Sequence, residues 1–261
     1  MKEKLESFLV KIPRSIANLG SYFIFLFNTI VSIFKTPFPL RECFRQAVKI
    51  GYESITVTVL TNFLMGAVIS LQLGINMERI LAGSSNQLGA MGLAIVTELG
   101  PVLTAVIVAG KTGSAMAAQI GTMKITEQID ALKTLSTDPI QYISVPRFLA
   151  SLIVLPILTI IADFTGVFGG YLVAMLSFNQ SIETFMETFI YITRAYDIIL
   201  GLLKAMIFGA IISTTSSYVG FNTEGGAEGV GKSTTQAVVL SSMGILIADL
   251  IVAATNNISI V

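Results

Sequence analysis

Residues 143–176 read ISVPRFLASLIVLPILTIIADFTGVFGGYLVAML, and this stretch decides the fold. Only Arg147 and Asp163 carry a charge within it. A helix of about 20 apolar residues crosses the hydrocarbon core of a bilayer, so the stretch predicts a transmembrane helix that is long enough to tilt or to extend past the bilayer. Four other stretches meet the same criterion, at residues 54–73, 88–120, 198–219 and 237–254.

The composition supports a membrane protein and excludes several other classes. Hydrophobic residues make up 53% of the chain and charged residues only 12%, whereas a soluble domain carries roughly a quarter charged residues. Lys and Arg balance Asp and Glu at 16 each, so the chain lacks the positive field that nucleic-acid binding needs. Because Cys43 is the one cysteine and histidine is absent, we expect no disulfide, metal site, cofactor or catalytic residue within this chain.

The predicted fold is an all-α integral membrane protein with an N-terminal interfacial helix and five transmembrane helices. The interfacial helix corresponds to residues 21–34, which are apolar but too few to span the bilayer. We therefore expect an N-terminal cytoplasmic and interfacial segment at 1–53 and a five-span domain at 54–261. Twelve Lys and Arg residues fall on the side of the N-terminus, against Arg79 and Arg194 on the other side, so the N-terminus is predicted in the cytoplasm and the C-terminus outside.

The segment KITEQIDALKTL, residues 124–135, joins the second and third spans. Its apolar residues recur at near-helical spacing and leave a charged opposite face, which predicts a short amphipathic helix in the cytoplasm. Such a helix lies against a membrane or in the groove of a partner protein. A surface helix that merely joins two spans is the alternative. The four apolar residues of the pattern are Ile125, Ile129, Leu132 and Leu135.

Four of the charged side chains inside the predicted spans are candidates for a functional role: Glu98, Lys111, Asp163 and Asp249. Each costs at least about 2.5–3.5 kcal/mol at mid-membrane, so we expect it to face protein or water. Glu98 and Lys111 fall on different faces of one helix, and Pro101 is expected to kink or break the span beside Glu98. The partner of Glu98 would then come from another span or subunit. A role at a substrate cavity and a structural ion pair are both open for the three carboxylates.

Several long motifs follow one another from Glu98 onward. They are Glu98-Leu99-Gly100-Pro101, AGKTGSAMAAQIGTMKITEQIDAL at 109–132, Thr137-Asp138-Pro139, Val145-Pro146-Arg147, and GGAEGVGKSTTQAVV at 225–239. In sequence order they resemble the MlaE-type permease family, the membrane subunits of Mce-associated phospholipid ABC transporters. Two positions depart from that family, because Gln119 stands where an acidic residue is usual and Thr97 where a basic residue is frequent.

This resemblance implies a permease subunit of an ABC transporter that moves phospholipid or a related lipid across or out of the membrane, without enzymatic activity of its own. Its implied partners are a cytoplasmic ABC ATPase subunit, an Mce-domain lipid-binding protein, a second copy in a homodimer, and membrane phospholipid. The implied location is a bacterial inner membrane or a plastid inner envelope. The helix at 124–135 becomes a coupling helix that inserts into the ATPase through Lys124, Glu127, Gln128, Ile129, Asp130, Leu132 and Lys133.

A lipid pathway needs an apolar wall for acyl chains and a few polar contacts for the head group. We predict that the first two spans supply part of this substrate cavity. The residues that we expect to line it are Glu98, Leu99, Asn62, Met65, Ile69 and Gln72.

Residues 226–233 match G-x-x-x-x-G-K-[ST], the phosphate-binding loop of ATPases. That chemistry needs a strand before the loop and a separate acidic residue for Mg²⁺, whereas here the motif joins two membrane spans. We interpret the match as accidental, with the glycines allowing a tight turn. Two alternative functions remain beside the permease. One is a nucleotide hydrolase that uses Gly226–Ser233, and the other is an ion-coupled secondary transporter in which Glu98 or Asp249 titrates.

Overall fold

The computed structural model describes residues 19–35, 38–81 and 85–258, so the first 18 residues of the predicted N-terminal segment 1–53 lie outside the described part of the chain. Within these ranges the protein is helical and has no strand, and five helices are long and apolar enough to cross a membrane. The predicted fold class is confirmed. The five candidate spans are Leu40–Arg79, Leu88–Ile125, Ile140–Phe178, Ala195–Phe221 and Gly226–Asn256, and a shorter apolar helix covers Leu19–Ile33.

Three of the spans are single α-helices, and the second and third contain irregular turns. The first span lies in α2 (Leu40–Leu81), the fourth is α9 (Ala195–Phe221) and the fifth lies in α10 (Gly226–Ile258). The second span begins within the 3-10 helix η1 (Ser85–Ala90). It continues through α3 (Met91–Ala94), the π-helical η2 (Ile95–Leu99), α4 (Gly100–Val108), the π-helical η3 (Ala109–Gly113) and α5 (Ser114–Ile125). The third span consists of the π-helical η4 (Ile140–Ser144) and α7 (Val145–Phe178).

Two of the three π-helical turns lie next to prolines, one of them at Pro101 as predicted, whereas η3 has no proline beside it. The π-helical η2 ends at Leu99, two residues before Pro101, and η4 ends at Ser144, two residues before Pro146. A proline has no backbone N–H, and its ring clashes with the carbonyl four residues earlier. A wider π turn moves that carbonyl aside and keeps the span continuous. The sequence therefore places a local distortion at Glu98.

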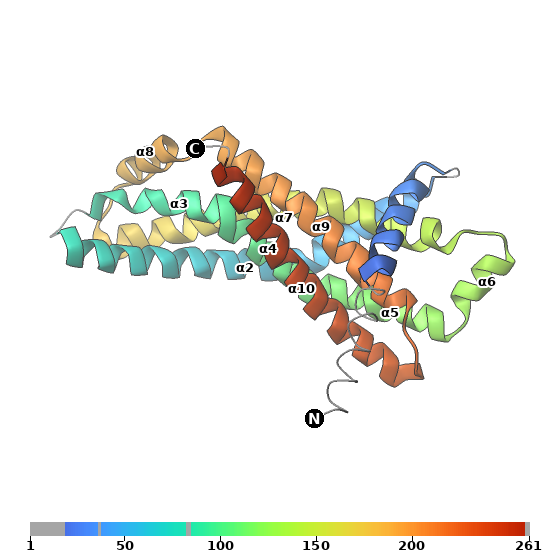
Figure 1. The fold of residues 1–261 in the computed structure, drawn as a ribbon. Helices are drawn as coiled ribbons and strands as arrows, with labels where there is room; N and C mark the ends of the chain where they lie inside the picture. The colour runs from blue at the N-terminus through green and yellow to red at the C-terminus, as the bar shows by residue number, and fades with distance from the viewer. Residues whose placement is uncertain (1–18, 36–37, 82–84, 259–261) are drawn as a thin grey trace, which may run out of the picture.

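Close backbone contact joins the first and third spans. Helices α2 and α7 lie side by side along most of their length (Figure 1). A β-carbon added at Gly66 of α2 would collide with the carbonyl of Gly166, and one added at Gly169 of α7 would collide with the carbonyl of Phe63. Small residues permit such close packing inside a membrane. The small residues of the third span thus serve packing within the chain.

The two ends of the bundle differ in charge and in their short helices (Figure 1). The N-terminal helix, α6 (Gln128–Thr134) and the start of α10 lie at one end, and α8 (Ile182–Ile192) and the end of α10 lie at the other. Most of the described Lys and Arg residues outside the spans lie at the α6 end. The predicted orientation rests on this distribution and stays a prediction. The sequence did not lead us to expect α8, although Ser181 caps it by accepting a hydrogen bond from the Thr184 N–H at 3.2 Å.

The first helix also begins earlier than predicted. Helix α2 starts at Leu40 rather than at residue 54 and is continuous through position 53. The proposed division between a segment at 1–53 and a domain at 54–261 therefore falls inside a helix, and its use as a domain boundary stays a prediction. The predicted limits 54–73 followed hydropathy alone. They therefore left out the first turns of α2, which carry charged residues.

Replacing Gly66 by alanine is expected to destabilise the protein by about 1–3 kcal/mol, since overpacking forces the two backbones apart. Thermal unfolding in detergent micelles measures this. Gly110→Ala is the matched control, because no atom lies within 4 Å of a β-carbon built there. Equal losses of stability in both variants would contradict the close contact of α2 with α7.

Candidate functional site

A lysine buried inside the membrane-spanning bundle joins three spans. Lys204 of α9 is fully buried, with 0% of its side chain exposed. Its Nζ lies 2.6 Å from Oε2 of Glu98 in η2 and 2.9 Å from Oδ1 of Asp249 in α10. The prediction that Glu98 finds its partner on another span is therefore confirmed. We call Glu98, Lys204 and Asp249 the ion triad.

Desolvation explains why this lysine has two carboxylates. An ammonium group in a low-dielectric interior loses several kcal/mol of hydration, and only close opposite charges compensate for that loss. The carboxylates are less enclosed, because the Asp249 side chain is 20% exposed and the Glu98 side chain 43% exposed. Glu98 therefore has two faces, one toward Lys204 and one toward the surface of this chain. The sequence reasoning missed Lys204 as the partner, although it is the one ionisable residue within the predicted span 198–219.

The other two candidate residues inside the spans, Lys111 and Asp163, have different surroundings. Lys111 is exposed and its ammonium donates a hydrogen bond to the backbone carbonyl of Glu53 in α2, so it does not pair with Glu98, as predicted. Asp163 of α7 lies against the backbone of Gly100. Its Oδ1 is buried and has no hydrogen-bond partner among the described residues. Lys111 thus connects the first two spans, and Asp163 carries an unsatisfied oxygen beside the distorted segment.

The predicted cavity residues of the first span have unequal exposure. Asn62 is 2% exposed and donates its amide N–H to the Thr58 carbonyl at 2.9 Å, so it belongs to the buried side of α2. Met65 and Ile69 are half-buried, and Gln72 is exposed. On the second span, Glu98 and Leu99 are both half-buried. Their joint role in a substrate cavity stays a prediction.

The predicted cytoplasmic helix is present, with different limits. Helix α6 covers Gln128–Thr134, while Lys124 belongs to the last turn of α5. The chain turns at Glu127, whose left-handed φ of 59° interrupts the helix. The prediction of one helix over 124–135 was therefore wrong at its N-terminal limit, because helical spacing continued across a turn that only the backbone conformation reveals.

The two faces of α6 have different environments. Ile129 is 1% exposed and packs in a cluster with Ile120 and Ile143, against which Leu132 and Phe221 also pack. Ile129 therefore anchors α6 to its own chain and is not available for a partner. The outward residues of the predicted coupling set are Glu127, Gln128, Asp130 and Lys133, and Leu135 beyond the helix end is 75% exposed.

Ion pairs hold the segments around α6 together. Asp130 lies 2.7 Å from Lys133 and 3.6 Å from Lys124. The hydrogen bond from Lys133 and the charges of both lysines hold the pKa of Asp130 below its ordinary value. Lys35, which follows the N-terminal helix, lies 2.7 Å from Asp138. The N-terminal helix is thereby tied to the start of the third span.

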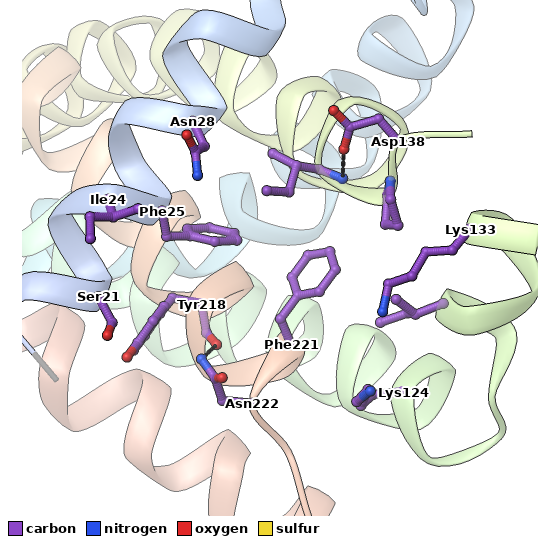
Figure 2. Close-up of a pocket in the computed structure, with 13 residues that line it drawn as sticks. Ser21, Ile24, Phe25, Asn28, Lys124, Lys133, Asp138, Tyr218, Phe221 and Asn222 are labelled. Atoms are coloured by element: carbon purple, nitrogen blue, oxygen red, sulfur yellow. Dashed lines mark hydrogen bonds between the residues drawn. The ribbon is translucent and has the colours of Figure 1, made fainter. Parts of the chain in front are cut away.

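Figure 2 shows a cavity of about 380 Å³ among the same segments. Its walls come from the N-terminal helix, from the α5–α6 corner, from the start of the third span and from the end of α9. The lining residues are Ser21, Ile24, Phe25, Asn28, Lys124, Ile129, Lys133, Asp138, Pro139, Ile140, Tyr218, Phe221 and Asn222.

The segment that matches a phosphate-binding loop forms the first two turns of α10. No strand precedes it among residues 85–258, since α9 ends at Phe221. Gly225 and Gly226 have positive φ values of 87° and 68°, as expected for the glycines of a tight turn. Lys232 pairs with Glu228 one helical turn earlier, at 2.8 Å. This geometry is that of a helix start and supports the accidental interpretation.

One departure from the family pattern keeps its hydrogen-bonding role. The amide oxygen of Gln119 accepts a hydrogen bond at 2.9 Å from Arg147, which is 4% exposed. Arg147 also donates to the carbonyl of Ile143 at 2.6 Å. Glutamine therefore supplies the acceptor that an acidic residue would supply at this position, without its charge.

Lys204→Met is expected to destabilise the chain by about 3–5 kcal/mol, because it leaves two carboxylates without their counter-charge. The triple variant Glu98→Gln, Lys204→Met, Asp249→Asn carries no charge at the ion triad and should recover much of the loss. Melting temperatures in uncharged detergent compare the two. A triple variant as unstable as the single one would show that the packing of Lys204, and not its charge, is what matters.

Comparison with known proteins gives one consistent result. A family model described as Permease MlaE matches residues 43–255. A probable ABC transporter permease protein of Rickettsia typhi is 43% identical over 235 residues, which cover 90% of both chains. A probable ABC transporter permease protein of Synechocystis is 40% identical over 210 residues, 80% of this chain and 79% of the relative. The chloroplastic protein TRIGALACTOSYLDIACYLGLYCEROL 1 of Arabidopsis thaliana is 38% identical over 228 residues, 87% of this chain and 65% of the relative. The chain therefore belongs to the MlaE permease family.

Proposed function

We propose that this chain is the permease subunit of an ABC transporter that moves phospholipid or a related lipid across or out of the membrane, powered by a separate ATPase chain. The observation that carries the proposal is the two-sided helix α6. Its inner face is fixed to the bundle through Ile129, and its outer face presents charged residues and Leu135 at the end that carries most of the basic residues. A surface helix held in this way transmits force from a partner into the spans.

The connection from α6 to the spans runs through packed apolar residues. Ile129 contacts Ile120 of α5 and Ile143 of η4, which belong to the second and third spans. Helix α5 in turn packs on α9 and α10. In our proposal, ATPase closure displaces α6, and this cluster passes the displacement to the second and third spans. The second span carries Glu98 of the ion triad.

The partial exposure of Glu98 supports a homodimer with the lipid path at its two-fold interface. A carboxylate that is 43% exposed at mid-membrane would face hydrocarbon in a single copy, at a cost of at least about 2.5–3.5 kcal/mol. A second copy that encloses a polar cavity removes this cost, and closed two-fold symmetry is the commonest solution for oligomers. The predicted cavity residues Met65, Ile69 and Leu99 would supply its apolar wall.

Two resemblances support the lipid assignment. The Arabidopsis relative carries the name of a lipid, trigalactosyldiacylglycerol, and the motifs from Glu98 onward resemble permeases of Mce-associated phospholipid transporters. We extend the proposal to an Mce-domain partner on the outer side and to a bacterial inner membrane or a plastid inner envelope. Copurification of an Mce-domain protein and of phospholipid from native membranes tests this extension.

The ion triad also bears on the alternative of an ion-coupled carrier. Glu98 and Asp249 are the groups that would titrate in such a carrier, and both lie within 3 Å of Lys204. A fixed counter-ion favours a structural link between spans over an exchangeable proton site. Lipid uptake into vesicles that contain this chain alone, driven by a proton gradient, would support the carrier instead.

Leu135→Asp together with Gln128→Arg is expected to reduce copurification of the ATPase at least ten-fold, since both substitutions alter the outer face of α6. Protein yield and melting temperature should stay near those of the unmodified chain. Ile129→Asp serves as the contrast, because it charges the buried cluster and should lower stability itself. Normal copurification with the first variant would remove the proposed coupling surface.

Lys232→Ala is expected to leave ATP hydrolysis by the assembled transporter unchanged, and the purified chain alone should not hydrolyse ATP. The reason is that Lys232 lies at the start of a helix, where it pairs with Glu228, and does not belong to a phosphate-binding loop. Hydrolysis and subunit content are measured on the same preparation. Lost hydrolysis with the ATPase still bound would favour the nucleotide hydrolase.

A further inference from the structure

The cavity of Figure 2 has one wall that is apolar and firmly held. Phe25 of the N-terminal helix contacts Tyr218 and Phe221 of α9, with ring centroids 5.8 and 5.6 Å apart. One turn earlier, the Tyr22 hydroxyl lies 3.2 Å from the Thr215 hydroxyl. These contacts fix the N-terminal helix on α9 and leave an aromatic wall that faces the cavity.

The opposite side of the cavity is basic. Lys124 and Lys133 reach it from the α5–α6 corner (Figure 2). The acidic lining residue is Asp138, which is already neutralised by Lys35 at 2.7 Å and also accepts the Ile140 N–H at 3.0 Å. Burial raises the pKa of Asp138, but these contacts with Lys35 and the backbone outweigh it and hold the pKa below its ordinary value. The lining therefore keeps an excess of positive charge.

The present partner of the two lysines is easily replaced. Both ammonium groups approach Asp130, which is about half exposed and stands outside the cavity lining. Exposed ion pairs of this kind contribute little to stability. A phosphate placed between the lysines would meet two charges at once, partly shielded from water by the cavity walls, and such charge-assisted contacts are stronger.

The cavity also borders the membrane surface. The N-terminal helix Leu19–Ile33 is too short to span a bilayer, yet Phe23 and Phe27 are 63% and 66% exposed on it. A helix with this composition lies in the interface, with its apolar residues in the acyl region. Lipid head groups therefore surround the helix that forms one wall of the cavity.

We propose that this cavity binds an anionic phospholipid of the cytoplasmic leaflet, with its phosphate between Lys124 and Lys133 and its acyl chains along the wall of Phe25 and Phe221. This site is distinct from the transport path, which the ion triad borders deep in the spans. A lipid held here touches the N-terminal helix, α6 and α9 together. Its presence would therefore stiffen the corner on which the ATPase is proposed to act.

Binding is tested on the purified full-length chain in uncharged detergent, with no ATPase present. The chain is titrated with dioctanoyl phosphatidylglycerol, and bound lipid is counted by native mass spectrometry. We expect saturable binding that Lys124→Gln with Lys133→Gln weakens at least ten-fold. The matched control, Lys49→Gln with Lys232→Gln, removes the same charge from two exposed lysines outside the cavity lining and should leave the affinity unchanged.

Asp130→Asn provides a test that misfolding cannot imitate. It removes the carboxylate that competes for both lysines, so the affinity for phosphatidylglycerol should rise several-fold. Absence of saturable binding, equal weakening in the control pair, or no gain with Asp130→Asn would each overturn the proposal. Equally tight binding of glycerol phosphate would also overturn it, since the site would then take a soluble phosphate compound. Because no ATPase is present, none of these results depends on the coupling role of α6.

Discussion

The structure depends on the placement of one positive charge inside a membrane. Lys204 is fully buried, and it is stable there only because Glu98 and Asp249 lie within 3 Å of its ammonium. These three residues belong to three different spans, so their pairing fixes how those spans are rotated about their own axes. Hydrophobic burial cannot do this inside lipid, because an apolar side chain is equally well solvated in any direction.

The π-helical turn η2 of the second span lies beside the same group of charges. A regular helix through Pro101 would lose a hydrogen bond and would clash with the turn before it. The π-helical η2 absorbs the proline and carries Glu98 at the same time. Non-helical or widened turns are tolerated at membrane depth only where protein surrounds them or a polar cavity adjoins them. The distortion and the charge thus occupy one protected region, beside the unsatisfied carboxylate oxygen of Asp163.

The short helix α6 has one face packed against the bundle and one face exposed. Ile129 ties α6 into a cluster shared with α5 and η4, while its charged residues face outward. Lys35 and Asp138 attach the N-terminal helix to the same region. The interfacial helix, the connection between spans and the end of α9 therefore form one unit. A movement of α6 would therefore act on all of these contacts together and, through them, on the spans.

The sequence by itself determined the number of spans, the interfacial helix, the irregularity at Pro101 and the family. These features are local, because hydropathy over about 20 residues decides spanning and a proline acts on its own helical turn. It also located Glu98 and Asp249 as charges that need partners within the membrane.

Only the tertiary structure decided which partners they have. Lys204 lies more than a hundred residues from Glu98 in the sequence, and a helix that is apolar on all sides carries no periodicity to show its inner face. The amphipathic pattern of residues 124–135 likewise did not reveal that Ile129 packs against its own chain. It also did not reveal the turn at Glu127 that separates α6 from the preceding helix. Rotation and close contact of helices in a membrane are set by packing between distant segments, which no single segment encodes.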